Sequence, residues 1–182
     1  MELVHLRREN RAMANDRFNA FHHVACIAPL KNDLKPVFHY VHSTGKELYG
    51  TDSKSLHISN IEEKVGYYKV IFCKSNEVVL HYEGDVVFNI PFPNCKALID
   101  PLIKRSKKIT ALSVPINTGL ASTLYKIARY LDEKNGLDFD RLKYLRRGWY
   151  NIYNMGENQP IYFESKEKTH SALIMPIQMK KG

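Results

Sequence analysis

The chain has 182 residues, of which 44% are hydrophobic and 25% are charged. This length and this apolar fraction are sufficient for a buried core, so they exclude intrinsic disorder as the default state. The formal net charge is +8, and a basic balance of this size favours a polyanionic partner.

The N-terminal half predicts one helix followed by strands. We expect the helix over residues 15–28, with Asp16 as its N-cap and Pro29 directly beyond its end. Short β-rich runs with Gly, Ser and Asn turns between them predict strands over 37–42, 47–50, 56–59, 67–73, 77–82 and 86–91.

The C-terminal half predicts three helices and a set of closing strands. The expected helices cover 94–105, 117–134 and 138–147, and Pro101 is an awkward residue inside the first of them. Strands are expected over 109–114, 149–154, 161–164 and 171–179. This order predicts an α+β fold, with a largely antiparallel sheet backed by two or three helices. We expect a single domain over residues 1–182 with an extra helical segment around 117–148.

The positive charge is concentrated in one segment. Residues 94–150 contain twelve Lys or Arg and five Asp or Glu, a net charge of +7, and the remaining residues carry a net charge of +1. A localised basic field favours a nucleic-acid backbone as partner. The alternative is a solvated basic face that keeps the protein in solution.

The cysteines and histidines do not form a recognisable site in the sequence. Cys26, Cys73 and Cys95 are widely spaced and odd in number, which predicts reduced core cysteines and neither a disulfide framework nor a zinc site. The eight histidines are not clustered, so we expect no metal and no cofactor. No apolar run approaches the roughly 18 residues that span a bilayer, and the first residues do not resemble a signal peptide, so we expect a cytoplasmic protein without membrane contact.

Two alternative functions come from local patterns. Glu164 and Lys166 form an E-x-K pattern at the end of a predicted strand, as in metal-dependent nucleases, although the nearest acidic candidates, Asp138 and Asp140, fall in a predicted helix. The helices predicted between residues 117 and 150 are also compatible with a helix-turn-helix transcriptional regulator. The Gly45–Lys46 pair is not a phosphate-binding loop, because the second glycine and the following helix are absent.

Several short stretches resemble the bacterial DNA polymerase sliding clamp, the beta processivity factor. They are DLKPVF at 33–38, LYGTDSKSL at 48–56, VFNIP at 87–91 with KAL at 96–98, and SALIMPIQM at 171–179. Their order along the chain is that of the family. The family pattern has glycine and arginine where this chain has Ser53 and Ser55, so the family's hairpin turn and one of its polar contacts are not expected to be kept unchanged. A clamp domain has two helices, and the second of them would correspond to either 94–105 or 117–134 in this chain.

The resemblance implies helices that face duplex DNA and contact its phosphates without reading the bases. It implies a non-enzymatic accessory factor of DNA replication that confers processivity. Ring clamps of this family use six domains, so the chain would form a homo-oligomer or act without closing a ring. The basic residues expected to contact DNA are Lys104, Arg105, Lys107, Lys126, Arg129, Arg141, Arg146 and Arg147.

The resemblance also implies a shallow apolar pocket that receives peptide motifs from polymerases or other replication proteins. In this chain the pocket maps to Thr51, Leu56, Met175 and Pro176. Ordinary core packing is the alternative explanation for Leu56 and Met175.

Overall fold

In this computed structural model, the described residues are 2–8, 16–28, 35–86, 91–106, 112–115, 135–136, 139–146, 148–154 and 158–178. The chain separates into two compact units, Met1–Pro93 and Asn94–Gly182. The expectation of one domain with an extra helical segment around 117–148 stays a prediction, because most of that segment lies outside the described residues. Most of the strand expected over 86–91 lies outside them as well.

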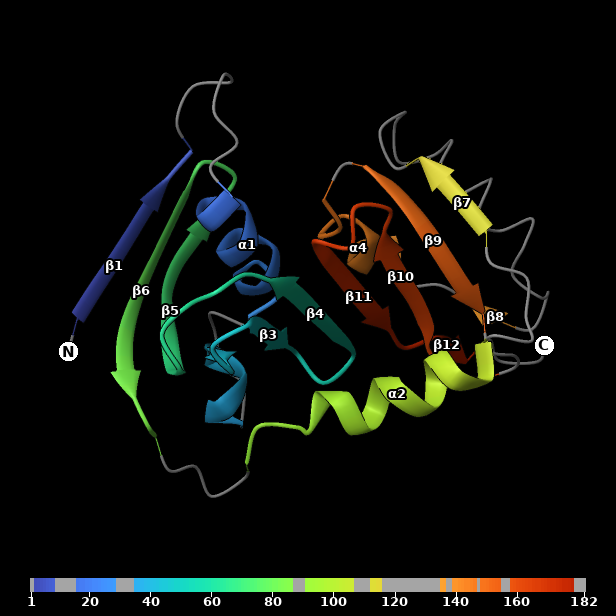
Figure 1. Ribbon diagram of the computed structural model, residues 1–182, viewed down its shortest axis with the longest axis horizontal. Coiled ribbons are helices and arrows are strands. Elements are labelled where there is room, and N and C mark those ends of the chain that lie inside the picture. Colours follow the sequence, from blue (N-terminus) through green and yellow to red (C-terminus); the bar gives the residue numbers. More distant parts are fainter. Residues whose placement is uncertain are drawn as a thin grey trace. The chain divides into compact units, whose positions relative to one another are not determined.

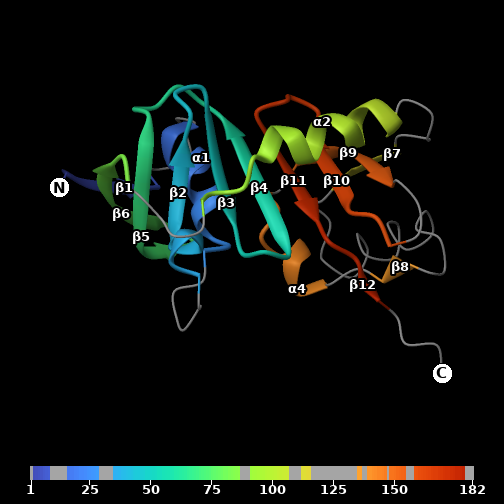
Figure 2. The same cartoon turned by 90° about the horizontal axis from the view of Figure 1, so that it is seen from below.

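The first unit is an antiparallel sheet with one helix against it (Figure 1). Its strands are β1 (Glu2–Arg7), β2 (Tyr40–Ser43), β3 (Glu47–Thr51), β4 (Ser55–Asn60), β5 (Gly66–Lys74) and β6 (Glu77–Gly84), in the spatial order β1-β6-β5-β2-β3-β4. Figure 2 shows β2 to β6 side by side. Helix α1 (Asp16–Ala25) covers the face whose buried side chains include Val41, Leu48 and Val70.

A glycine permits the close approach of α1 to the sheet. Gly50 of β3 lies against the main chain of Val24, and a Cβ atom at Gly50 would overlap the Val24 carbonyl. Phe18, Phe21 and Val24 are buried, as their helical spacing predicts. The first unit therefore has a core between α1 and the sheet.

The second unit contains a four-stranded antiparallel sheet. Its order is β11 (His170–Ile174), β10 (Ile161–Ser165), β9 (Trp149–Asn154) and β7 (Leu112–Pro115), and β8 (Asn135–Gly136) pairs separately with β12 (Ile177–Gln178). Helix α2 (Cys95–Ser106) begins the unit, and α4 (Phe139–Leu142) lies between β8 and β9. The buried cluster joins Leu142 and Leu145 to Tyr150, Ile152, Ile161, Phe163, Ala172 and Ile174.

The prediction of an antiparallel sheet with helices is confirmed, and the structure corrects four local predictions. Residues 36–39 form the 3-10 helix η1 (Pro36–His39) instead of a strand, because Pro36 presets a helical φ and Phe38 N donates to Lys35 O (3.0 Å). Residues 135–136 pair as a strand instead of ending a helix. The helix expected over 138–147 is reduced to α4, and the strand expected over 171–179 is interrupted at Met175 and Pro176, since proline has no N–H.

Strand β1 was not predicted at all. Val4 and Leu6 point into the core while His5 and Arg7 are exposed, which is the alternation of a half-buried strand. Leu3 obscures this alternation, because it is apolar and yet exposed. No helix in the described part of the chain is long and apolar enough to cross a membrane.

Candidate nucleic-acid interface

Helix α2 presents cations on its exposed face. The helix begins after Asn94, whose side-chain oxygen accepts a hydrogen bond from Ala97 N (3.2 Å), which is an N-cap contact. Cys95 and Ile99 are buried, one turn apart. Pro101 lies on the exposed side, where water can satisfy the carbonyl group that proline leaves without an N–H donor.

The exposed residues of α2 carry more positive than negative charge. Lys96, Lys104 and Arg105 are exposed, and Asp100 is the acidic residue between them. Lys96 and Lys104 lie about 12 Å apart along the helix axis and on the same side, because eight residues make a little more than two turns. Among the described residues, neither Lys104 nor Arg105 has an ion-pair partner, so their charge is available to a polyanion.

Two other residues that were predicted to contact DNA lie in the described part of the chain, and both are less exposed than Lys104 and Arg105. Arg141 lies on α4 and is half-buried, and this burial lowers the pKa of its guanidinium. Arg146 is also half-buried, and its carbonyl oxygen accepts a hydrogen bond from the Tyr150 hydroxyl (2.8 Å). The remaining predicted contacts lie outside the described residues: Lys107, Lys126, Arg129 and Arg147.

The TDSKSL segment forms a tightly bonded hairpin between β3 and β4. Thr51 pairs with Leu56, and Asp52 Oδ1 accepts hydrogen bonds from Lys54 N (3.0 Å), Ser55 N (2.8 Å) and Ser55 Oγ (2.9 Å). Ser53 has a φ of +72°, in the left-handed region that favours glycine. The clamp pattern has glycine here, so this chain keeps the turn at some conformational cost.

The predicted peptide-pocket residues differ in exposure. Thr51 and Leu56 belong to the first unit and are both buried. Met175 and Pro176 belong to the second unit, in the break between β11 and β12, and Met175 is 43% exposed. Core packing accounts for the burial of Leu56, whereas Met175 is available for contact with a partner.

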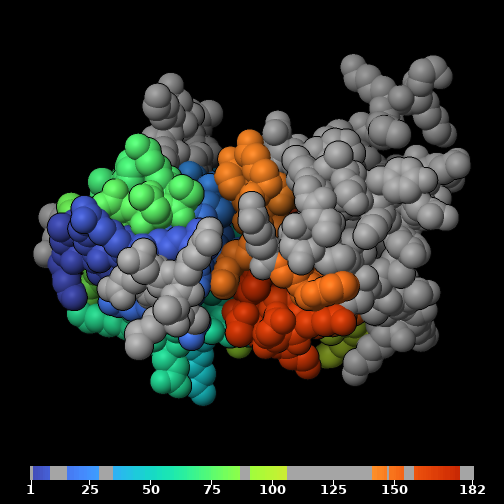
Figure 3. Space-filling view, turned by 90° about the horizontal axis from the view of Figure 1, so that it is seen from above, coloured from blue at the N-terminus to red at the C-terminus, as the bar shows by residue number. Residues whose placement is uncertain are grey.

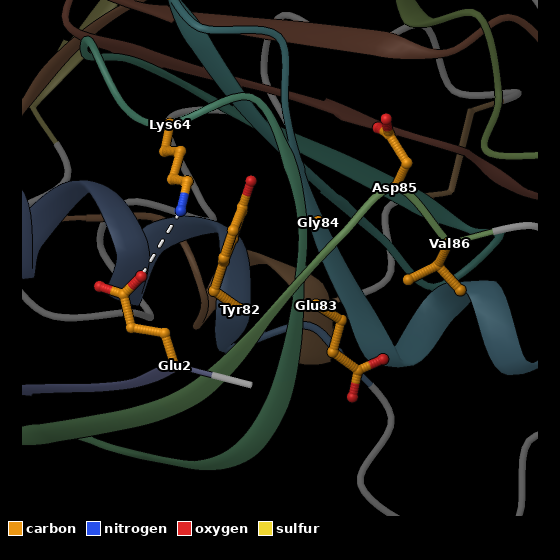
Figure 4. A pocket seen from close by; sticks show the side chains of 7 residues that line it. All are labelled: Glu2, Lys64, Tyr82, Glu83, Gly84, Asp85 and Val86. Atoms are coloured by element: carbon orange, nitrogen blue, oxygen red, sulfur yellow. Dashed lines mark ion pairs between the residues drawn. The ribbon is translucent and has the colours of Figure 1, made fainter.

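A surface hollow of about 760 Å³ lies in the first unit (Figure 4). It is lined by Glu2, Lys64, Tyr82, Glu83, Gly84, Asp85 and Val86. Lys64 is paired with Glu2 (3.6 Å) and lies over the Tyr82 ring, 4.2 Å from its centroid. Three carboxylates against one lysine make this hollow acidic, so it is unsuited to a phosphate backbone.

The E-x-K pair is engaged in other contacts. Glu164 accepts a hydrogen bond from the Tyr153 hydroxyl (3.2 Å), and Lys166 Nζ lies 5.3 Å from the centre of the Trp149 indole. No group of three His, Cys, Asp or Glu side chains among the described residues is arranged to hold a metal ion. Burial raises the pKa of the Cys26 thiol, which disfavours the reactive thiolate.

The helix-turn-helix alternative has little support in the residues that the structure describes. Its expected second helix is α4, which has four residues and is followed by turns in which Tyr144 N donates to Arg141 O and Leu145 N to Leu142 O. A helix of this length does not fill a major groove. The expected first helix, 117–134, lies outside the description.

Comparisons by sequence find no relative. No family model matches the chain, and no curated protein matches it.

Comparisons of the structure find DNA polymerase III beta clamps. The Helicobacter pylori beta clamp in complex with 3,4-difluorobenzamide matches with a TM-score of 0.57 at 12% identity, covering 91% of this chain and 65% of the clamp chain. The beta subunit from DNA polymerase of Streptococcus pyogenes matches with a TM-score of 0.51 at 8% identity, covering 98% and 66%. The Helicobacter pylori clamp bound to a DNA ligase peptide gives 0.50 and 13%, covering 97% and 65%.

The fold is clamp-like. This is a statement about the fold alone, because the identities are far below those that carry function. The chain spans about two thirds of the length of these clamp chains. On helix α2, Lys96 is the exposed basic residue that the sequence analysis left out of the basic set. Its spacing of eight residues from Lys104 was the signal that places both on one side of α2.

Proposed function

We propose that this protein is a clamp-like accessory factor of DNA replication that contacts duplex phosphates and reads no bases. The observation that carries the proposal is the exposed, unneutralised cation pair Lys104 and Arg105 on a helix of a clamp-like fold. Long cationic side chains on an exposed helix face contact phosphates irrespective of sequence. The other predicted cations, Lys107, Lys126, Arg129, Arg141, Arg146 and Arg147, extend the proposed surface.

Salt-dependent duplex binding tests this function. The affinity of the full-length protein for a labelled random-sequence duplex is measured between about 50 and 200 mM salt, where the release of counterions predicts a linear log–log plot. The double variant Lys104→Gln/Arg105→Gln is expected to lower the salt slope by about 1.8, because each lost phosphate contact removes about 0.9. The matched control is Lys69→Gln/Lys74→Gln, which removes the same charge from exposed positions of β5.

The outcome separates the proposal from its alternatives. An unchanged slope in the α2 variant, or an equal reduction in the β5 variant, contradicts the assignment of α2. Strong preference for one duplex sequence contradicts phosphate-only contact and favours a regulator. Cleavage of DNA with magnesium or manganese, abolished by Lys166→Ala, would support the nuclease and contradict a non-enzymatic factor.

We also propose that the chain self-associates. Ring clamps close around DNA only when enough domains are joined, and this chain spans about two thirds of a solved clamp chain. Light scattering is expected to give a multiple of the 21.1 kDa chain mass. A strict monomer at high concentration contradicts the ring form of the proposal.

A peptide of a replication protein is the second proposed partner. Of the four residues assigned to its pocket, Thr51, Leu56, Met175 and Pro176, the exposed Met175 offers the largest accessible apolar contact. Met175→Ser is expected to weaken binding of a labelled DNA ligase peptide about tenfold, in line with the loss of one buried apolar side chain. Ile71→Ser is the control, because Ile71 is equally exposed but lies on β5. Equal effects of both variants contradict the assignment.

A further inference from the structure

An exposed tryptophan stands at the start of β9, away from the proposed α2 surface in sequence. Trp149 is the only tryptophan of the chain, and 46% of it is exposed. Tyr150 and Ile152, which follow it in the strand, point into the core of the second unit. Because side chains alternate along a strand, the indole lies on the opposite side of the sheet from Tyr150.

A lysine accompanies the indole. Lys166 Nζ lies 5.3 Å from the indole centroid, and Lys166 N donates a hydrogen bond to Trp149 O (2.9 Å). Lys166 is exposed, and among the described residues no carboxylate pairs with it. An aromatic face and an uncompensated positive charge therefore meet at one exposed position.

The turn that carries Lys166 is held by hydrogen bonds to Ser165. Ser165 Oγ accepts hydrogen bonds from Thr169 N (3.1 Å) and His170 N (3.2 Å), and Ser165 O accepts one from Lys168 N (2.9 Å). Lys168 is exposed on the same turn and adds a second cation, and the exposed Glu167 between the two lysines leaves the turn a net positive charge of one. A turn fixed in this way loses little conformational entropy when a ligand binds.

The chain before Trp149 is held in the same manner. The buried Tyr150 hydroxyl donates to Arg146 O (2.8 Å) and is bonded to His170 Nε2 (2.7 Å), so one side chain ties the segment before β9 to the start of β11. In Figure 3, coloured atoms from residues 141–153 (orange) and from the segment 158–176 (red-orange) are visible at the surface. The indole and the lysine thus project from a supported frame.

We propose that Trp149 and Lys166 form a binding site for single-stranded DNA. An unpaired base stacks on the indole, and Lys166 contacts an adjacent phosphate, with Lys168 next to it. Indole stacking requires an unpaired base, because the bases of a duplex are stacked on one another and are not accessible. An exposed cation–π contact is weak, so the lysine can turn toward a phosphate when a strand binds. The choice of DNA over RNA rests on the proposed function.

The single tryptophan supplies a direct measurement. Intrinsic fluorescence of the full-length protein is followed during titration with a twenty-nucleotide oligo-dT and, separately, with a duplex of equal length. We expect oligo-dT to quench the fluorescence with saturation and the duplex to quench it little. Absence of quenching by oligo-dT, or equal quenching by the duplex, overturns the proposal. Tighter binding of oligo-rU overturns the choice of DNA, and quenching by the DNA ligase peptide alone assigns the site to a protein partner.

Variants test the two roles separately. Binding of labelled oligo-dT is expected to weaken about fivefold to a hundredfold in Trp149→Ala, and less in Trp149→Phe, which keeps an aromatic face and controls for folding. Lys166→Gln is expected to lower the salt slope by about 0.7. The matched control is Lys74→Gln, because Lys74 Nζ also lies over an aromatic ring, 4.8 Å from that of Phe72.

The two proposals fail in different ways. Lys104→Gln/Arg105→Gln is expected to weaken duplex binding and to leave oligo-dT binding unchanged. Loss of duplex binding in the Trp149 variants, or no effect of Trp149→Ala on oligo-dT binding, contradicts the single-strand site and leaves the α2 assignment intact.

Discussion

The buried His57 imidazole predicts a specific dependence of stability on pH. His57 lies on β4 with its side chain fully buried, its Nδ1–H donates to His23 O on α1 (2.9 Å), and the two rings lie 4.5 Å apart. Burial lowers the pKa of His57 from its ordinary 6.5 to about 4, and the hydrogen bond to His23 opposes this only in part. The perturbation is therefore acidification, because it protonates His57 in the unfolded chain at a higher pH than in the folded protein.

The magnitude follows from the two pKa values. Above pH 6.5 His57 is neutral in both states, so its full contribution to stability is present. Between pH 6.5 and about 4 the unfolded chain binds a proton that the folded protein excludes, so the free energy of unfolding falls as the pH falls. The total loss from His57 is about 3 kcal/mol, of which about 2 kcal/mol is lost by about pH 5.

Urea unfolding of the wild type and of His57→Asn at about pH 7, 6 and 5 is the assay. Asparagine places an N–H donor near the position of the imidazole Nδ1, so it can still bond to His23 O, but it does not titrate. The variant is expected to be less stable at neutral pH, because ring packing is lost. The stability gap between the two proteins is expected to shrink by about 2 kcal/mol from about pH 7 to pH 5. A gap that stays constant with pH would refute the reasoning.

Substitutions at three further positions test the packing and the backbone by urea unfolding at neutral pH. Gly50→Ala is expected to cost about 3 kcal/mol, because the new methyl group meets the rigid Val24 carbonyl; a neutral effect would contradict the close approach of α1. Ser53→Gly is expected to stabilise by about 0.5–1 kcal/mol, since glycine tolerates the positive φ, whereas Ser53→Val is expected to destabilise. Tyr150→Phe is expected to cost about 1–2 kcal/mol, because the buried hydroxyl bonds Arg146 O; an unchanged stability would contradict that contact.

The helices and most strands were predictable because their signals are local. Phe18, Phe21 and Val24 recur at the spacing of a helix face, and Asn94 and the apolar residues after it mark the start of α2. Strand β1 was missed because the exposed Leu3 interrupts the short alternation of apolar and polar residues. The strand is stabilised by its pairing with β6, which is distant in sequence. The pairing of residues 135–136 depends on β12, a partner distant in sequence, so no local pattern contains it.

The candidate site was predictable only where its signals are local in the sequence. The local excess of positive charge and the resemblance to the sliding clamp singled out Lys104 and Arg105, which do lie exposed on α2. The sequence does not reveal that Arg146 is half-buried with its carbonyl bonded to Tyr150, because this depends on a contact made in the folded core. The nuclease alternative gave Lys166 a place in a metal site, whereas its position over Trp149 follows from the turn between β10 and β11.

Lysine footprinting tests the central claim, contact of the α2 face with the duplex backbone, most directly. The protein is acetylated with and without a saturating random-sequence duplex, and each lysine is quantified by mass spectrometry. The account predicts that DNA protects Lys96 and Lys104 on α2 and leaves Lys69 and Lys74 on β5 as reactive as before. Protection of the β5 lysines with none on α2 would contradict it.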